Sequence, residues 1–222
     1  MLHHDIKGFL DSLYSRKNIK TFNVKDYSPW QLSNTQQMVF KDEAGAQLGG
    51  PYGSLSLACI YNDVVDGRLT LIGDEKFLPQ SVWGRLTLVN AHIDDENDYY
   101  AHLQELTLLP LKNFMQGVMI RIQPSEYKEW IRIHKDYTKR NNVVMLLSQL
   151  YQWYIQKEWV KAVEFVAITS TSDDVALLQP LAEKQKSIIT AFGKRLAEDI
   201  KQCDSCDNNA LCKEINLLFQ KG

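Results

Sequence analysis

The sequence predicts an α/β or α+β protein, with a mixed five- to six-stranded sheet covered by helices and a short helical cysteine-containing tail at the C-terminus. Two observations predict this class. Some segments alternate apolar and polar residues with the period of a strand, and others repeat apolar residues with the period of a helix. The two kinds of segment are interleaved along the chain, whose 222 residues are 45% hydrophobic and can therefore build a substantial core.

The N-terminal segment is expected to be mainly helical and to end in a loop. Residues 2–14 place Ile6 and Leu13 on one side of an amphipathic helix. Ser28-Pro29-Trp30 matches an N-cap followed by proline at the first position of a short second helix. Residues 42–53 are rich in glycine and polar residues, and they predict a loop.

Three strands are predicted next. Residues 54–60 and 69–72 are apolar and flank Asp66-Gly67, a dipeptide typical of tight hairpins, so these two strands are expected to pair with each other. Residues 85–93 predict the third strand.

The rest of the chain is expected to alternate helices and strands. The predicted helices cover residues 94–109, 142–153 and 173–200, and the predicted strands cover residues 117–123, 129–134 and 163–169. The first helix starts at an acidic run and should end near Pro110, whereas the last should break near Pro180. Three parts follow: an N-terminal helical segment (1–46), an α/β domain (47–200) and a cysteine-containing tail (201–222).

Three of the four cysteines lie close together in the tail, as Cys203, Cys206 and Cys212. A C-x2-C pair followed by a third thiol gives three soft ligands that a local turn can aim at one point, which suits an iron–sulfur cluster or zinc. Both kinds of site usually need a fourth donor, which could be Cys59, a residue of a partner or an exogenous molecule. A disulfide plus one free thiol is the alternative.

Charge and hydropathy narrow the class of function. The formal charge of −2 and the isoelectric point near 6.2 disfavour a dedicated nucleic-acid binder, which needs a basic face. No apolar run approaches the roughly 20 residues of a membrane span, and the polar N-terminus does not match a secretory signal. We therefore expect a cytoplasmic protein whose thiols are reduced or bind metal.

Several segments together resemble the middle domain of bacterial carbon monoxide dehydrogenase/acetyl-CoA synthase. They are Leu48-Gly49-Gly50-Pro51, the Asp66-Gly67 turn, Gly117-Val118, Trp130-Ile131-Arg132-Ile133-His134-Lys135-Asp136, the helix around Leu147, Leu150 and Tyr151, and Val163-Glu164-Phe165-Val166-Ala167-Ile168-Thr169. The resemblance covers residues 47 to 190, as a stand-alone chain without the domain that holds the nickel-iron-sulfur A-cluster.

The resemblance implies an accessory or subunit-like protein of anaerobic carbon metabolism that binds coenzyme A or a partner subunit. In that family, tryptophan and arginine residues of the middle domain contact coenzyme A, and by position Trp130 and Arg132 correspond to them. Acetyl-CoA synthesis by the isolated chain is not expected, because the chain supplies only three clustered thiols.

Each of these features also has a structural interpretation. Trp130 and Arg132 share one face of a strand, where they could stack on an adenine and pair with a phosphate, or simply cover a half-buried sheet. His134, on the same face, could be a fourth ligand or a general base, or a surface histidine. Glu126 and Glu129 are interpreted as solvated charges.

Two further interpretations complete the expectations. The glycines of residues 49–53 could cradle a phosphate, but they precede a strand instead of opening a helix, so a turn is predicted. The alternative to the accessory enzyme subunit is a non-catalytic interaction module in which the tail holds a structural zinc ion or free thiols.

Overall fold

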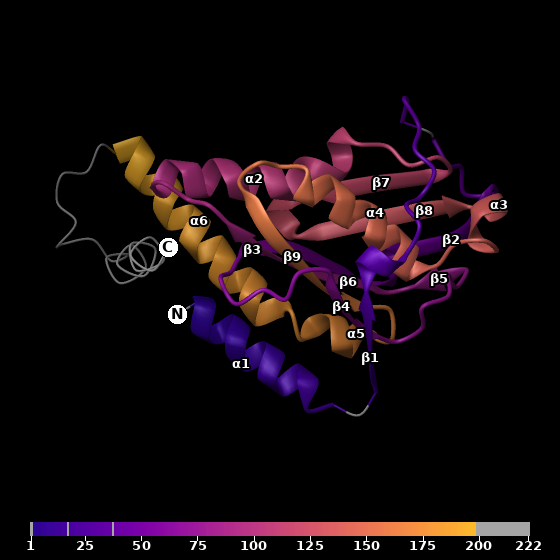
Figure 1. The fold of residues 1–222 in the computed structure, drawn as a ribbon, viewed down its shortest axis with the longest axis horizontal. Coiled ribbons are helices and arrows are strands. Elements are labelled where there is room, and N and C mark those ends of the chain that lie inside the picture. The colour runs from indigo at the N-terminus through magenta and orange to yellow at the C-terminus, as the bar shows by residue number, and fades with distance from the viewer. Residues whose placement is uncertain (1, 17, 37, 199–222) are drawn as a thin grey trace.

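The computed structural model describes residues 2–16, 18–36 and 38–198, and it has the α/β class that the sequence predicts. Its described strands form two mixed sheets instead of one, a five-stranded sheet and a four-stranded sheet, with helices packed against them (Figure 1). The predicted cysteine-containing tail, residues 201–222, lies outside the described residues.

The five-stranded sheet has the order β1-β4-β9-β6-β3. Its strands are β1 (Ile19–Asn23), β4 (Arg68–Ile72), β9 (Val160–Ile168), β6 (Trp83–Ala91) and β3 (Ser54–Ile60). β4 is parallel to β9 and β3 is parallel to β6, whereas β1 and β4, and β6 and β9, are antiparallel. The strands predicted at residues 85–93 and 163–169 are confirmed as β6 and β9, with slightly different ends.

The hairpin predicted at Asp66-Gly67 is wrong, because the two strands that flank it are not neighbours in the sheet. The turn itself forms, and Gly67 has the positive φ of +80° that glycine adopts readily. The Gly67 N–H donates to the carbonyl of Val163 at 2.8 Å, and the Asp66 carboxylate accepts from the Val163 N–H at 3.1 Å. The turn therefore docks on β9, and this contact directs the following strand to β9 instead of back to β3.

The four-stranded sheet has the order β5-β2-β8-β7. Its strands are β5 (Gln80–Ser81), β2 (Ala44–Gly49), β8 (Lys128–His134) and β7 (Val118–Gln123). The strands β7 and β8, which the sequence predicts to be adjacent, are neighbours in this sheet and run antiparallel. The loop predicted at residues 42–53 is wrong over β2, whose small residues lack a clear alternation, and right over the 3-10 turn η2 (Gly50–Tyr52).

The helices agree with the expected ones in most places. They are α1 (Leu2–Tyr14), α2 (Glu96–Lys112), α3 (Lys135–Thr138), α4 (Val143–Ile155), α5 (Ser172–Ala176) and α6 (Gln179–Glu198), with 3-10 turns η1 (Val24–Asp26) and η3 (Pro124–Glu126). The break before Pro180 is confirmed between α5 and α6. Pro110 lies inside α2 instead of ending it, and no helix follows Ser28.

Both faces of the five-stranded sheet are covered (Figure 1). Helices alone cover one face, and two further helices together with the second sheet cover the other. α1, α5 and α6 pack on one face around Leu57, Leu88 and Val166. α2, α4 and the four-stranded sheet pack on the other face around Trp83 and Phe165. Residues 1–46 thus supply β1 and the start of β2 as well as the predicted helix, so they share the core with the rest of the chain. None of the helices in the described ranges is long and apolar enough to cross a membrane.

Candidate functional site

The cysteines predicted to bind metal, Cys203, Cys206 and Cys212, lie outside the described residues. Cys59 lies in β3 and is fully buried, and burial raises the pKa of its thiol to about 12. The thiol faces the side-chain oxygen of Gln185 on α6 at 3.7 Å. Cys59 is therefore a neutral core thiol in this fold and is not placed to act as a fourth thiolate ligand. Within residues 2–198 as described, no three His, Cys, Asp or Glu side chains are grouped as a metal site.

Trp130 and Arg132, the residues predicted to bind coenzyme A, lie side by side on the half-buried outer face of β8. The Arg132 guanidinium lies over the Trp130 ring, with its carbon 4.4 Å from the ring centroid. Gly50 is also close to this ring, because a Cβ at Gly50 would lie 3.1 Å from three ring atoms. Arg132 further donates to the Val39 carbonyl at 3.3 Å. An adenine could stack on Trp130 only after Arg132 had left its place, so the pair is arranged for contact within the chain.

The chain that follows β8 forms a basic turn. His134 ends β8 and caps α3, because its Nδ1 accepts from the Asp136 N–H at 3.3 Å. The same nitrogen lies 3.3 Å from the Asp136 carboxylate. His134 is therefore engaged locally, and Asp136 is directed back towards it. Lys135, Lys139 and Arg140 supply the basic side chains of this turn.

The basic turn forms one side of a cleft of about 790 Å³ at the end of the molecule where β8 meets α3. The opposite side is the segment Pro29, Trp30 and Gln31, which precedes Lys135 by about a hundred residues. The buried Trp30 indole donates to the Gln116 carbonyl at 3.0 Å, and this bond fixes the segment beside β7. The volume of the cleft lies within the range of roughly 300–1,000 Å³ that is usual for small-molecule sites.

Tyr137 supplies the aromatic wall of the cleft. Its ring lies nearly parallel to the Trp30 ring, at 17° and a centroid distance of 6.1 Å. The ring also packs against Gly117, which has a φ of +70°, and a Cβ at this position would overlap the ring. Trp30 and Gly117 thus hold Tyr137 in place from two sides.

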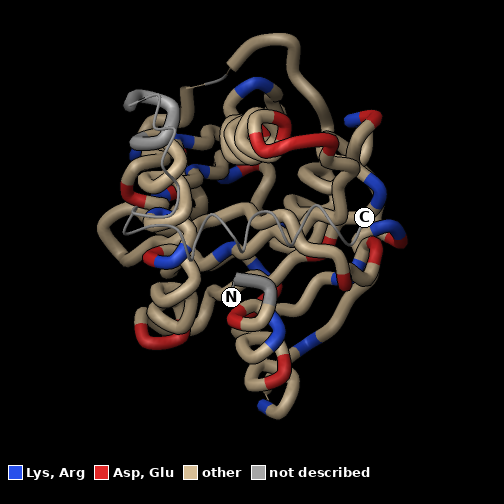
Figure 2. Tube along the Cα trace, turned by 90° about the vertical axis from the view of Figure 1, so that its left-hand side faces the viewer, with Lys and Arg blue, Asp and Glu red and all other residues tan. Residues whose placement is uncertain are grey.

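Lys135, Lys139 and Arg140 are exposed and all line the cleft. None of the three side chains is in an ion pair with another residue of the described ranges. Together with Asp136 they give the lining a charge of 3 − 1 = +2, whereas the whole chain carries −2. At the other end of the molecule, basic and acidic residues are interspersed (Figure 2).

The cleft also adjoins the N-terminus of α4. Asn142 caps this helix by accepting from the Met145 N–H at 2.9 Å, and Asn141 beside it lines the cleft. The Asn141 amide donates to the Tyr137 carbonyl at 2.9 Å, which ties the basic turn to the helix start. The positive end of the helix dipole adds to the positive potential of the lysines and the arginine. The arrangement as a whole can hold an anion.

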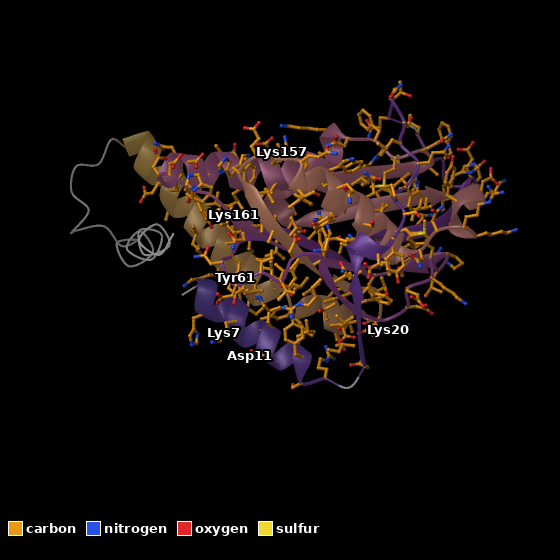
Figure 3. The ribbon with its side chains drawn as sticks, viewed as in Figure 1. Lys7, Asp11, Lys20, Tyr61, Lys157 and Lys161 are labelled. Carbon is orange, nitrogen blue, oxygen red and sulfur yellow. The ribbon has the colours of Figure 1, made fainter. Side chains whose placement is uncertain are left out.

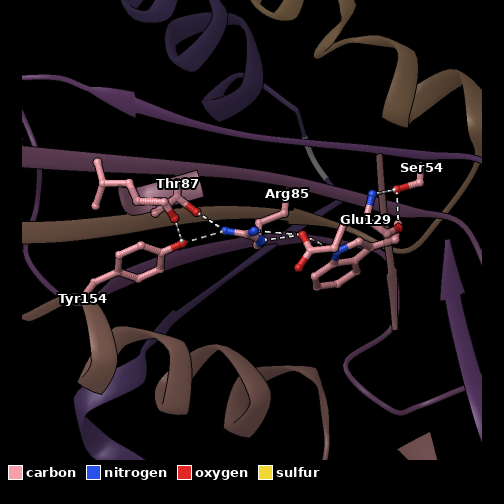
Figure 4. Close-up of polar contacts among 7 residues, drawn as sticks. Ser54, Arg85, Thr87, Glu129 and Tyr154 are labelled. Carbon is pink, nitrogen blue, oxygen red and sulfur yellow. Dashed lines mark hydrogen bonds and ion pairs between the residues drawn. The ribbon is translucent and has the colours of Figure 1, made fainter. Parts of the chain in front are cut away.

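A second group of charges is fully buried between the two sheets (Figure 4). Arg85 of β6 pairs with Glu129 of β8, with nitrogen–oxygen distances of 2.8 and 2.9 Å, and both side chains are at most 3% exposed. Arg85 also donates to Thr87 at 2.5 Å and to Tyr154 at 3.3 Å. The Trp83 indole donates to Glu129 at 3.3 Å.

The electrostatics of this buried pair are those of a structural contact. Burial is the largest single influence on Arg85 and disfavours its charged form, but Glu129 and Tyr154 together, through charge and hydrogen bonds, outweigh burial and raise the pKa of Arg85 above its ordinary value. Ser54 of β3 adds to the junction, because its hydroxyl donates to the Glu129 carbonyl at 2.5 Å. Solutes do not reach these side chains, so the group joins the two sheets and has no direct role in binding.

The expectation that Glu129 is a solvated charge is wrong. Glu129 lies in β8 in phase with Ile131 and Ile133, which are also fully buried, so the alternation of the strand already assigned it to the inner face. The cleft was missed for a different reason. The basic run from Lys135 to Arg140 is visible in the sequence, but no local signal links it to Trp30.

Comparisons with known proteins identify no relative of this chain. No family model matches the chain, and no curated protein is similar to it in sequence. The geometry of the described residues is therefore the basis for a functional proposal, with the cleft between Trp30 and Arg140 as its centre.

Proposed function

We propose that the protein is an accessory, ligand-binding protein that holds a phosphate-bearing molecule with a flat ring in the cleft at α3. The observation that carries this proposal is the group of Lys135, Lys139 and Arg140, exposed cations that form no ion pair with any described residue and line the same cleft as a fixed aromatic ring. Three like charges on one turn repel each other, and an exposed charge contributes little to folding, so an anionic ligand accounts for their grouping better than packing does.

The cleft assigns a role to each part of such a ligand. The guanidinium of Arg140 can hold two phosphate oxygens at once, whereas the ammonium groups of Lys135 and Lys139 act as point charges. Tyr137 is held between Trp30 and Gly117 and lines the cleft, so a base or another flat ring can pack against the part of its ring that these two residues leave open. Hydrogen bonds to charged groups contribute roughly 1.5–3 kcal/mol each, so two of them already distinguish a phosphate from a neutral ligand.

Coenzyme A is the first ligand to test, because residues 47–190 resemble the acetyl-CoA synthase middle domain and this resemblance implies that the protein binds coenzyme A. Coenzyme A carries both phosphates and an adenine, which is the combination that the cleft can accommodate. We place it at Lys139, Arg140 and Tyr137, since Trp130 and Arg132 contact each other.

The accessory role includes the cysteines of the tail. In our proposal Cys203, Cys206 and Cys212 hold an iron–sulfur cluster, and the protein works with a partner subunit of the carbon monoxide dehydrogenase/acetyl-CoA synthase type. Zinc or free thiols in an interaction module are the alternative. Iron and zinc content of protein prepared without oxygen, compared with its Cys203→Ser variant, decides between them.

Calorimetric titration with coenzyme A, and separately with pyrophosphate, tests the cleft. We expect one site per chain, tighter binding of coenzyme A than of pyrophosphate, and weaker binding of both as salt increases. The double substitution Lys139→Gln/Arg140→Gln should raise both dissociation constants about 100-fold or more, because two charged hydrogen bonds of roughly 1.5–3 kcal/mol each amount to about 3–6 kcal/mol.

A matched variant removes the same charge elsewhere. Lys7 and Lys161 are exposed and lie on the side of the molecule away from α3 (Figure 3). The double substitution Lys7→Gln/Lys161→Gln should leave both dissociation constants within about twofold of the original, because charges beyond a Debye length of about 8–10 Å are screened. Equal losses in both double variants, or no binding of either probe by the unaltered protein, would refute the proposed site.

A further inference from the structure

A second cleft, which we call the α2–α6 slot, lies between these two helices and the turn η3. Its volume is about 590 Å³, and its lining is mainly apolar. The buried side chains of Tyr100 and Leu103 line it from α2, and Ile189 lines it from α6. Ile189 is 39% exposed and is one of the few large apolar residues that are exposed in the described ranges. The slot thus presents apolar surface that the fold leaves open to solvent.

Tyr127 at the mouth of the slot has an unusual backbone. It is the one non-glycine residue in the described ranges with a positive φ, +50°, in the left-handed region. This conformation places its carbonyl where it accepts from the Ser56 N–H at 2.6 Å, and it turns the ring into the lining of the slot. The same conformation ends η3, because the Tyr127 N–H donates to the Pro124 carbonyl, so the backbone at the mouth of the slot is fixed.

The polar side chains that line the slot differ in whether they already have a partner within the chain. Gln185 at its base is fully used, because its amide donates to the Ala58 carbonyl at 2.6 Å. Glu126 lies 4.0 Å from the ammonium group of Lys128. The ammonium of Lys186 on α6 has no ion-pair partner among the residues that the structure describes. The slot is thus lined by one carboxylate, which faces Lys128, and by one ammonium group, that of Lys186, which is available to a ligand.

We propose that the α2–α6 slot binds an amphipathic carboxylic acid, with its alkyl or aryl body on Leu103, Ile189 and Tyr127 and its carboxylate at Lys186. The apolar body accounts for the open apolar lining, and the carboxylate complements the unpaired ammonium group. Sites of this kind, an apolar cleft with a single orienting charge, are common for small ligands.

This site is separate from the cleft at α3. β8 begins at Lys128, next to the turn that lines the slot, and ends at His134, next to α3. Six steps of roughly 3.3 Å along a strand give about 20 Å between the two ends. One small ligand cannot fill both sites, so the second proposal does not depend on the first.

Titration of the full chain with decanoate, decanol and decylamine, each below its micelle concentration, tests the slot. Decanoate should bind at one site per chain and more tightly than the other two. Gln104 is exposed on α2 at the mouth, so Gln104→Trp should fill the slot with little effect on folding. We expect it to weaken decanoate about tenfold, equivalent to roughly two methylene groups kept out of the slot.

Two more variants complete the test. Lys186→Gln should weaken decanoate about threefold, as for an exposed ion pair, and leave decanol unchanged. Ala101→Trp, on an exposed position of α2 outside the slot, should bind decanoate like the unaltered protein. Tighter binding of decylamine than of decanoate, or equal losses in Gln104→Trp and Ala101→Trp, would overturn the proposal. Pyrophosphate should not compete with decanoate, whatever the outcome at α3.

Discussion

Two regions of the molecule concentrate charged side chains, and they differ in exposure to water. One is the pair of Arg85 and Glu129, and the other is the group of Lys135, Lys139 and Arg140. Arg85 and Glu129 are withdrawn from water and meet each other between the two sheets. The three cations of the cleft remain in water and form no ion pair within the part of the chain that the structure describes, and the nearby Asp136 is directed to His134.

This difference separates charges that belong to the fold from charges that are available to a ligand. A buried charge is tolerable only when its partner is in place, so removing one member of the pair alone should destabilise the fold. An exposed charge contributes little to folding, and its position is free to serve binding. Substitutions in the two regions should therefore have effects of very different size on the free energy of unfolding.

The largest effect is expected at the buried pair. Glu129→Gln keeps the shape of the side chain but leaves Arg85 without a counter-charge in the interior, which should cost about 3–5 kcal/mol. Urea unfolding followed by circular dichroism measures this loss.

A double variant distinguishes charge from packing at this place. Arg85→Met/Glu129→Leu removes both charges and fills the space with apolar groups, so it should regain most of the stability that Glu129→Gln loses. If the double variant is as unstable as the single one, the pair is needed for its hydrogen bonds to Trp83, Thr87 and Tyr154 and not for charge balance alone.

An intermediate effect is expected at Gly117, which connects the fold to the cleft. Gly117→Ala places a Cβ against the ring of Tyr137 and forces a positive φ on a side chain, which together should cost roughly 2–3 kcal/mol. Pyrophosphate binding should weaken as well, because Tyr137 is displaced. The control is Gly8→Ala in α1, where a Cβ meets nothing within 4 Å and helix stability should rise by about 0.5–1 kcal/mol.

The sequence predicted individual helices and strands better than it predicted which strands pair with each other. α1 and the β7–β8 pair followed from residue periodicity, since both depend on contacts between residues near in sequence. The pairing of β3 with β6 and of β4 with β9 did not, because the hydrogen bonds from the Asp66-Gly67 turn reach Val163, almost a hundred residues away. Turn chemistry favours a bend but does not determine which strand the chain meets after it.

The candidate site also combines a local feature, which the sequence shows, with contacts that only the tertiary fold creates. The basic turn at Lys139 and Arg140 is a local feature, and it could have been marked as a possible anion site from the sequence alone. Trp30 and Gly117, which fix Tyr137, come to it only through the tertiary fold. Trp130 and Arg132 do share a strand face, as predicted, but the sequence could not show that they would stack on each other.

The smallest effect on stability is expected for the cleft itself. Lys139→Gln/Arg140→Gln removes two charges that have no partner in the described structure, so the free energy of unfolding should change by no more than about 0.5 kcal/mol. Any change should be a gain, because repulsion with Lys135 is reduced, and the gain should disappear at high salt. The measurement is the same urea titration as for Glu129→Gln, carried out at low and at high salt. A loss comparable to that of Glu129→Gln would show that these cations support the fold, and the distinction between the two regions would then fail.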